Sequence, residues 1–200
     1  MGEIRIPIKK TAIEKKNRII KMGFELMCEE GYFNVSCIDI AARANVSTGI
    51  IYQYFKDKKD IFICGIDSYA DEILFPILNI LEDNELIDSR RKNILSDIID
   101  KLIQSHWLSK KAHEELMAMV HIDKEIASIF CKMEIEITEK IIEKLKNKKI
   151  IVNDTKEKIH IIIGVVENFC HEVVYHQHEN INYDLMKEEV MKIVLYLLND

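Results

Sequence analysis

Residues 47–58 concentrate side chains whose types and spacing could recognise a nucleic acid. Thr48 carries a hydroxyl that can donate to or accept from a base edge, and Gln53 carries an amide that can bond adenine at two points. Ile50 can touch the methyl group of thymine, and Gly49 allows a backbone to come close. This composition is expected of a helix that inserts its N-terminal end into a groove of DNA.

A second group in the same segment suits the phosphate backbone. The hydroxyls of Tyr52 and Tyr54 are long enough to reach phosphates on either side of a groove. Lys58 lies in the first turn of the next helix, where free backbone amides and a positive side chain both favour a phosphate.

Two short helices joined by a tight turn must position these groups. Ser36 and Asp39 predict a capping box, in which each side chain accepts the backbone amide of the other residue. Asn45 tolerates the left-handed backbone that ends the first helix. Ser47 then caps the second helix.

The second helix of this pair has an apolar face. Ile51 and Phe55 lie four residues apart and are predicted to face inward, whereas Tyr54 is predicted to face outward or sideways. Asp57 follows as the cap of a third helix. The pattern also fits any pair of short helices in an all-helical protein, but the run Tyr-x-Tyr-Phe-Lys-x-Lys over residues 52–58 favours DNA binding, since it places phosphate-reaching groups at the walls of a groove.

The segment from Glu29 to Lys58 resembles the N-terminal domain of the TetR family of bacterial transcriptional regulators nearly position by position. The resemblance covers about the first 60 residues, and the remainder of the chain carries no family motif. Two positions depart from the family pattern. Asn45 replaces the more usual glycine of the turn, and Gly23 lies where the first helix usually has alanine, at a cost of about 1 kcal/mol in helix propensity.

The resemblance implies roles for eight residues. Bases would be faced by Thr48, Gly49, Ile50 and Gln53, and the phosphate backbone would be contacted by Ser47, Tyr52, Tyr54 and Lys58. We accordingly expect an all-α fold of about nine helices. An N-terminal three-helix helix-turn-helix DNA-binding domain would occupy residues 1–56, and a C-terminal helical ligand-sensing and dimerisation domain would occupy residues 57–200.

The distribution of charge agrees with this division. The whole chain has a net charge of −6 and a pI near 5.7, which taken alone argue against binding nucleic acid. Residues 1–60 hold 11 basic and 8 acidic side chains, a net of +3, and residues 61–200 hold 17 and 26, a net of −9. The basic part therefore coincides with the motif, and its modest charge indicates that both arms of a dimer are needed.

Apolar spacing predicts further helices beyond the motif. A first helix is expected before the motif, at residues 11–30. The helices after the motif are expected from 58 to the low 80s and at 90–107, 111–120, 123–148, 154–178 and 184–198. Pro76 falls inside the second of these ranges and predicts a kink or break between Glu72 and Pro76. This feature is either a flexure between the two halves or a plain helix end. Asp154 is expected to cap the helix that runs to about His178.

The last two helices are apolar on more than one face, so burial on two sides is expected. One stripe comprises Ile159, Ile162, Val166, Phe169, Val173 and Val174, and the other comprises Leu185, Val190, Ile193, Val194, Leu197 and Leu198. Gly164 would permit close helix approach. We therefore predict a homodimer in which these two helices pair with their symmetry mates and two recognition helices read a palindrome.

Polar or adaptable groups within apolar helices predict a cavity for a small, largely apolar molecule. The predicted lining residues are Trp107, Met117, Met119, His121, Phe130, Met133, Glu167 and His171. A plain packed core is the alternative for any single one of them. His106 belongs to the same class of polar group within an apolar helix.

The sequence predicts neither a catalytic centre nor a cofactor or resident metal. A phosphate-binding glycine loop, a nucleophile elbow and a triad-like arrangement are all missing from the sequence. The one metal-like run spans residues 171–178, where His171 and His178 are seven apart and could share a helix face. Ordinary surface or packed histidines are the favoured interpretation of this run.

The five cysteines form no CxxC pair, and no apolar run approaches the length of a membrane span. We therefore expect buried, reduced thiols, no membrane partner and a cytoplasmic location. The leading hypothesis for function is a repressor that leaves its operator when a small molecule binds the C-terminal domain. The alternatives are a regulator-fold protein controlled by a protein partner without such a ligand, and a metal-dependent enzyme.

Overall fold

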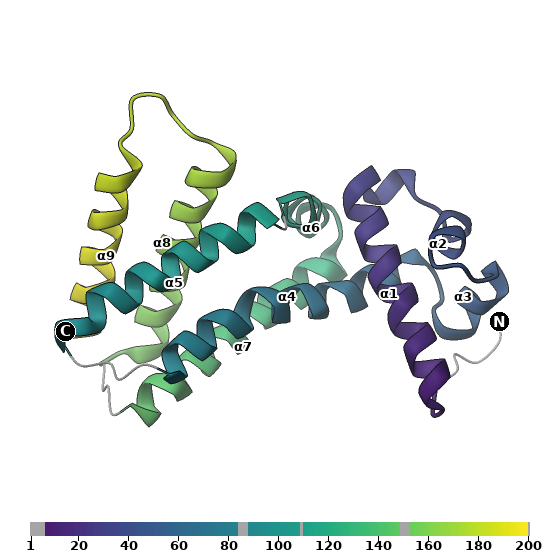
Figure 1. Ribbon diagram of the computed structural model, residues 1–200, viewed down its shortest axis with the longest axis horizontal. Coiled ribbons are helices and arrows are strands. Elements are labelled where there is room, and N and C mark those ends of the chain that lie inside the picture. The colour runs from purple at the N-terminus through teal and green to yellow at the C-terminus, as the bar shows by residue number, and fades with distance from the viewer. Residues whose placement is uncertain (1–6, 84–87, 109, 149–152, 200) are drawn as a thin grey trace. The chain divides into compact units, whose positions relative to one another are not determined.

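The computed structural model describes residues 7–83, 88–108, 110–148 and 153–199, and within these ranges every regular element is a helix (Figure 1). The predicted all-α class is therefore confirmed. The chain divides into two compact units, Met1–Asp71 with Lys111–Ala127 and Glu72–Lys110 with Ser128–Asp200. The functional boundary between residues 56 and 57 is a different division and stays a prediction.

The first unit contains the N-terminal helices. Its elements are α1 (Lys10–Glu30), the short 3₁₀ helix η1 (Tyr32–Asn34), α2 (Cys37–Arg43), α3 (Thr48–Tyr54), the first part of α4 (Lys58–Asp83), most of α6 (Lys110–Ile122) and the start of α7 (Lys124–Asn147). Helix α1 ends at Gly31, whose φ of 90° is accessible to glycine without strain.

Both predicted signals around α2 are confirmed. Ser36 and Asp39 form the capping box, with the Ser36 amide donating to Asp39 Oδ2 over 2.8 Å and the Asp39 amide donating to Ser36 Oγ over 3.3 Å. Asn45 adopts the left-handed backbone at φ 51°. Together these residues set where α2 begins and how the chain turns into α3.

The inner face of α3 is broader than the sequence predicted. Ile51 and Phe55 are buried as expected, but Tyr54 is only 6% exposed, so its predicted outward orientation is wrong. The reason is helical spacing: Tyr54 is three residues after Ile51 and next to Phe55, so it falls on the same inward face. Its ring packs edge-on against that of Phe55, with centroids 6.5 Å apart.

Helix α4 runs without interruption from Lys58 to Asp83, so the predicted helix end near Pro76 is wrong. A kink at this proline stays a prediction. The division between the two units falls between Asp71 and Glu72, within the segment where the kink was expected.

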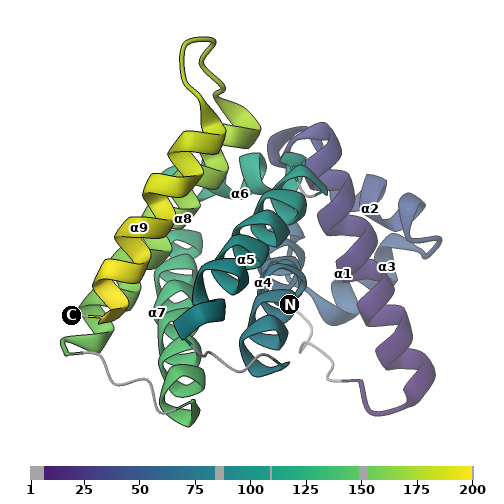
Figure 2. The same cartoon turned by 60° about the vertical axis from the view of Figure 1, so that its left-hand side comes forward.

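The second unit holds the remainder of α4 and α7 together with α5 (Asp88–Leu108), α8 (Thr155–Tyr175) and α9 (Tyr183–Asn199). Helices α5, α8 and α9 pack along one another, as both views show (Figures 1 and 2). Their shared core comprises Ile99, Leu102, Val166, Phe169, Cys170, Val190, Met191 and Val194.

Helix α8 departs from the sequence prediction at both ends. Asp154 is the N-cap residue, but its backbone is left-handed and its side chain makes no capping bond. The helix ends at Tyr175, before His178, so His171 and His178 do not share one helix. The argument that these two histidines lie on one helix face is therefore wrong.

The cysteines are less uniform than expected. All five are free thiols, but only Cys28 and Cys170 are buried, Cys37 and Cys64 are half-buried, and Cys131 is exposed. The expectation of buried thiols therefore holds for Cys28 and Cys170 and is wrong for Cys131. Among the described residues, no helix combines the length and apolar character needed to cross a membrane.

Gly65 provides a test of packing between α1 and α4. A Cβ at this position would lie 2.3 Å from Phe24 Cδ2 and 2.6 Å from Phe24 Cβ, so Phe24 must move. We expect Gly65→Ala to lower the free energy of unfolding by about 1–3 kcal/mol through overpacking, despite a gain of about 1 kcal/mol in helix propensity. Urea denaturation followed by far-UV circular dichroism measures this change. Ser68→Ala, at an exposed site of the same helix, is the control, and equal effects of the two substitutions would contradict the packing argument.

Candidate nucleic-acid interface

Helix α3 carries the four predicted base contacts, three of them in its first turn and Gln53 in its last turn. Gly49 and Gln53 are exposed, and Thr48 and Ile50 are half-buried. Ser47 is the exposed N-cap residue, but its hydroxyl makes no capping bond, contrary to the prediction that it caps the helix. Hydroxyl, amide and apolar groups thus lie along one short helix, which is the chemistry required to bond base edges in a major groove.

Tyr52 lies beside this surface and is 54% exposed. Its hydroxyl forms a hydrogen bond with Cys37 at the start of α2, and this bond raises the pKa of the Tyr52 phenol. Burial raises the pKa of the Cys37 thiol as well, with the Tyr52 bond acting in the opposite direction. Both groups therefore stay protonated at neutral pH, and Tyr52 remains a hydrogen-bond donor.

The other two predicted phosphate contacts have structural partners within the first unit. Tyr54 is buried beside Phe55. Lys58 Nζ donates to the carbonyl oxygens of Tyr32 over 2.6 Å and Val35 over 2.7 Å, and it lies 4.5 Å from the centre of the Tyr32 ring. Lys58 thereby anchors the turn that precedes α2. Phosphate contacts by Tyr54 and Lys58 stay predictions.

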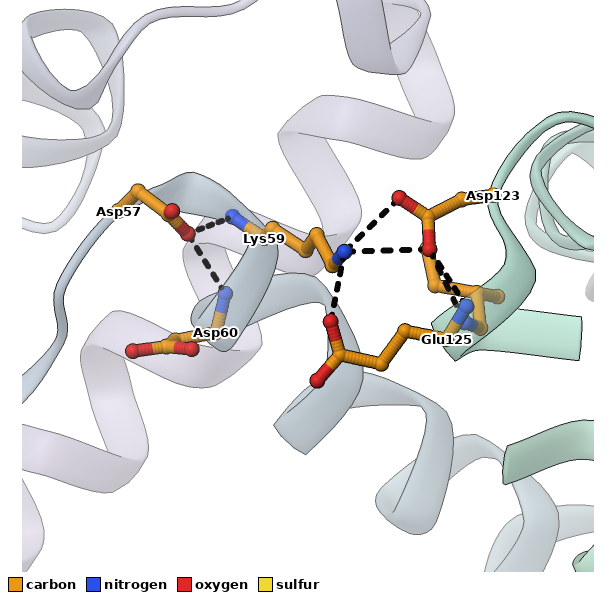
Figure 3. A network of polar contacts seen from close by, with 6 residues as sticks. Asp57, Lys59, Asp60, Asp123 and Glu125 are labelled. Carbon is orange, nitrogen blue, oxygen red and sulfur yellow. Dashed lines mark hydrogen bonds and ion pairs between the residues drawn. The ribbon is translucent and has the colours of Figure 1, made fainter. Parts of the chain in front are cut away.

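An ion-pair network holds the start of α4 against the turn between α6 and α7 (Figure 3). Lys59 Nζ lies 2.9 Å from Asp123 Oδ2 and 2.7 Å from Glu125 Oε2. Asp57 Oδ1 accepts the amides of Lys59 and Asp60, which confirms its predicted capping role. Hydrogen bonds with the two carboxylates raise the pKa of Lys59, and the bond with Lys59 lowers the pKa of Asp123.

Two further polar contacts link α6 to the N-terminal helices of the same unit. Glu115 Oε1 accepts the backbone amide of Tyr32 over 2.6 Å. The Tyr69 hydroxyl and His113 Nδ1 lie 3.0 Å apart. Sequence reasoning missed these residues and the Lys59 network, because the partners are separated by 44 to 83 positions in the chain.

The predicted ligand-pocket residues fall into both units. Met117, Met119 and His121 belong to the first, and Trp107, Phe130, Met133, Glu167 and His171 belong to the second. Met119 is buried, whereas His121 and Trp107 are exposed. Within the second unit, Glu167 and His171 both lie beside the buried His106. The pocket itself stays a prediction.

Comparison with known proteins agrees with the geometry of the first unit. A family model described as "Bacterial regulatory proteins, tetR family" matches residues 19–63, which cover α2, α3 and the start of α4. Over these residues the chain is a match to the TetR family. The transcriptional regulator HbdR of Aromatoleum sp. (strain CIB) is 42% identical over 64 residues, which are 30% of this chain and 28% of HbdR.

Solved structures extend the likeness to the whole fold. A Mesorhizobium loti MAFF303099 protein described as TetR-family is 16% identical, with a TM-score of 0.73 over 96% of this chain and 98% of that one. A Saccharomonospora viridis protein in complex with choline is 16% identical, with a TM-score of 0.65 over 92% and 97%. The chain spans 28% to 64% of the lengths of the first curated relatives that it matches.

Substitution of Lys58 tests its anchoring role in this TetR-family domain. We expect Lys58→Met to lower the free energy of unfolding by about 1–3 kcal/mol, since two half-buried carbonyl groups lose a charged donor. Amide hydrogen exchange of residues 31–36 should also become faster. The exposed Lys56 is the matched control, and Lys56→Met should change stability by no more than about 0.5 kcal/mol. Unchanged exchange in Lys58→Met would contradict the anchoring role.

Proposed function

We propose that this protein is a DNA-binding regulator of transcription, and specifically a repressor. The observation that carries the proposal is the composition of α3, which has Thr48, Gly49 and Ile50 in its first turn and Gln53 in its last turn. The same four residues would face bases, with Ser47 and Tyr52 on the phosphate backbone beside them. A protein that binds chromosomal DNA must share a compartment with it, which agrees with the predicted cytoplasmic location.

A small molecule that binds the C-terminal domain would release the repressor from its operator. The likeness in fold to a protein that binds choline supports an effector of this size. Release requires that the molecule bind more tightly to a state whose recognition helices are spaced wrongly for the operator. The polar contacts from Glu115, Asp123 and Glu125 would keep α6 and the α3–α4 region moving as one body.

A homodimer would supply the second recognition helix. Large apolar side chains on α8 and α9 are exposed in the single chain: Ile161, Leu185, Ile193 and Tyr196. On α9 they recur at intervals of eight and three residues and so lie on one face of the helix. Gly164, next to Ile161 on α8, is also exposed, with no atom within 4 Å of a Cβ built on it. This face would pair with its symmetry mate, and the dimer would read a palindromic operator.

DNA binding can be tested with the DNA that flanks the protein's own gene. Gln53→Ala should weaken discrimination between the operator and a mutated site by about 1–3 kcal/mol. Tyr52→Ala should instead weaken binding to both sites equally, because a phosphate contact carries no sequence information. Gel shift or fluorescence anisotropy over a series of salt concentrations measures both effects. A flat dependence of affinity on salt would contradict DNA binding by this surface.

The dimer face can be tested independently of DNA. Ile161→Asp introduces a charge at the centre of the proposed contact and should shift the chain from dimer to monomer in analytical ultracentrifugation. Ile122→Asp is the matched control, since Ile122 is similarly exposed but lies on α6 in the first unit. Circular dichroism checks that both variants keep their helices. A dimer that persists in Ile161→Asp, or is lost equally in Ile122→Asp, would contradict the assignment of this face.

A further inference from the structure

Three groups that attract a positive charge meet at the end of α8 in the second unit. Lys110, the first residue of α6, belongs to this unit, and its ammonium lies over two aromatic rings. Nζ is 5.6 Å from the centre of the Trp107 ring and 5.1 Å from that of the Tyr175 ring. It also donates to the Val174 carbonyl oxygen over 3.3 Å. Both ring distances are within the range of cation–π attraction, about 6 Å.

The Val174 carbonyl faces a cation because α8 ends one residue later, at Tyr175. In a longer helix this carbonyl would accept the amide of the residue four positions on. That amide belongs to His178 and instead donates to the Tyr183 hydroxyl over 2.8 Å. The carbonyl groups at the C-terminal end of a helix also carry the negative partial charge of its dipole, which favours a cation there.

The position of the Tyr175 ring does not depend on the Lys110 ammonium. This ring meets that of His171 edge to face, with centroids 5.4 Å apart. Its hydroxyl donates to the backbone carbonyl oxygen of Lys110 over 3.5 Å. The second ring, Trp107, is at the end of α5, which packs along α8, and it is 54% exposed, so solvent reaches the site. The two rings would therefore stay in place for another cation if the Lys110 side chain moved away.

The ammonium of Lys110 is poorly matched to these surroundings. It carries three donors, but within the described part of the chain its Nζ has one hydrogen-bond acceptor and no carboxylate partner. A primary ammonium is strongly hydrated, and aromatic rings replace that hydration incompletely. A methylated ammonium has no donor to satisfy, and its methyl groups can pack against both rings. Two aromatic faces without a carboxylate therefore favour a methylated ammonium over a primary one.

We propose that Trp107, Tyr175 and the Val174 carbonyl form a binding site for a small methylated ammonium compound, and that the Lys110 ammonium occupies this site when the compound is absent. The net charge of −9 over residues 61–200 attracts cations to this part of the chain. The proposal names the chemical class of the small molecule in the proposed function, and it rests on that function only for the effect on DNA. Binding itself is measured without DNA.

Trp107 is the single tryptophan of the chain, so its fluorescence reports directly on the site. The full chain can be titrated with tetramethylammonium chloride as the probe, with NaCl holding the ionic strength constant. We expect a saturable change in emission. The neutral molecule tert-butanol, which is similar in size, should give none, because cation–π attraction requires the charge.

Lys110→Ala removes the tethered competitor and should bind tetramethylammonium about tenfold more tightly than the unmodified chain. Lys111→Ala is the matched control, since it removes the adjacent, exposed lysine, and it should leave the affinity unchanged. In the Lys110→Ala background, Tyr175→Leu removes one aromatic face and should weaken binding about tenfold, whereas Tyr175→Phe keeps the face and should change the affinity by less than about twofold.

Circular dichroism confirms folding of each variant, and the comparison of the two probes in Lys110→Ala still decides should Tyr175→Leu unfold. An equal response to tert-butanol, an affinity in Lys110→Ala no tighter than in the unmodified chain, or full affinity in Tyr175→Leu would each overturn the proposal. A failure to bind the operator in the gel shift would contradict the proposed function alone, because the fluorescence titration contains no DNA.

Discussion

The structure of the first unit depends on the burial of one face of a seven-residue helix. A helix as short as α3 has no stability of its own in water, since the cost of its first turn is repaid only over a dozen or more residues. Ile51, Tyr54 and Phe55 supply the stability by entering the core of the unit. The exposed residues on the other side of the helix, such as Gly49 and Gln53, are then held in place by this burial.

The supports of α3 are themselves fixed by polar contacts at its two ends. The capping box of Ser36 and Asp39 sets the start of α2, and Lys58 anchors the turn before it. On the far side, Lys59 joins the start of α4 to the carboxylates of Asp123 and Glu125. These ion pairs are partly exposed, so their contribution lies in orientation more than in stability.

In the second unit, the same helices carry both a buried apolar stripe and an exposed one. Helices α8 and α9 bury one stripe against α5 and leave another exposed, as Ile161 and Tyr196 show. A single chain therefore satisfies only part of the apolar surface of these helices. The polar cluster around His106 lies on the buried side, where a charge is costly without a partner, and so it distinguishes this interface from a plain packed core.

The sequence by itself determined the local features. The capping box, the left-handed Asn45, the helix-turn-helix and the all-α class follow from residues close together in the chain, because caps and turns are formed by neighbours. The inward faces of the long helices were also predictable from spacing, as with Val166 and Phe169. Tyr54 follows the same rule, since it lies three residues after Ile51 and is buried, although it was predicted to face outward.

Only the tertiary structure decided which distant residues meet. Lys58 resembled a phosphate ligand in the sequence, and its bonds to Tyr32 and Val35 depend on how the chain folds back. Lys59 and Asp123, or His106 and Glu167, are separated by more than 60 positions, and no local pattern pairs them. The physical reason is that charge and hydrogen bonding act through space, whereas sequence spacing reports only the neighbours along one helix.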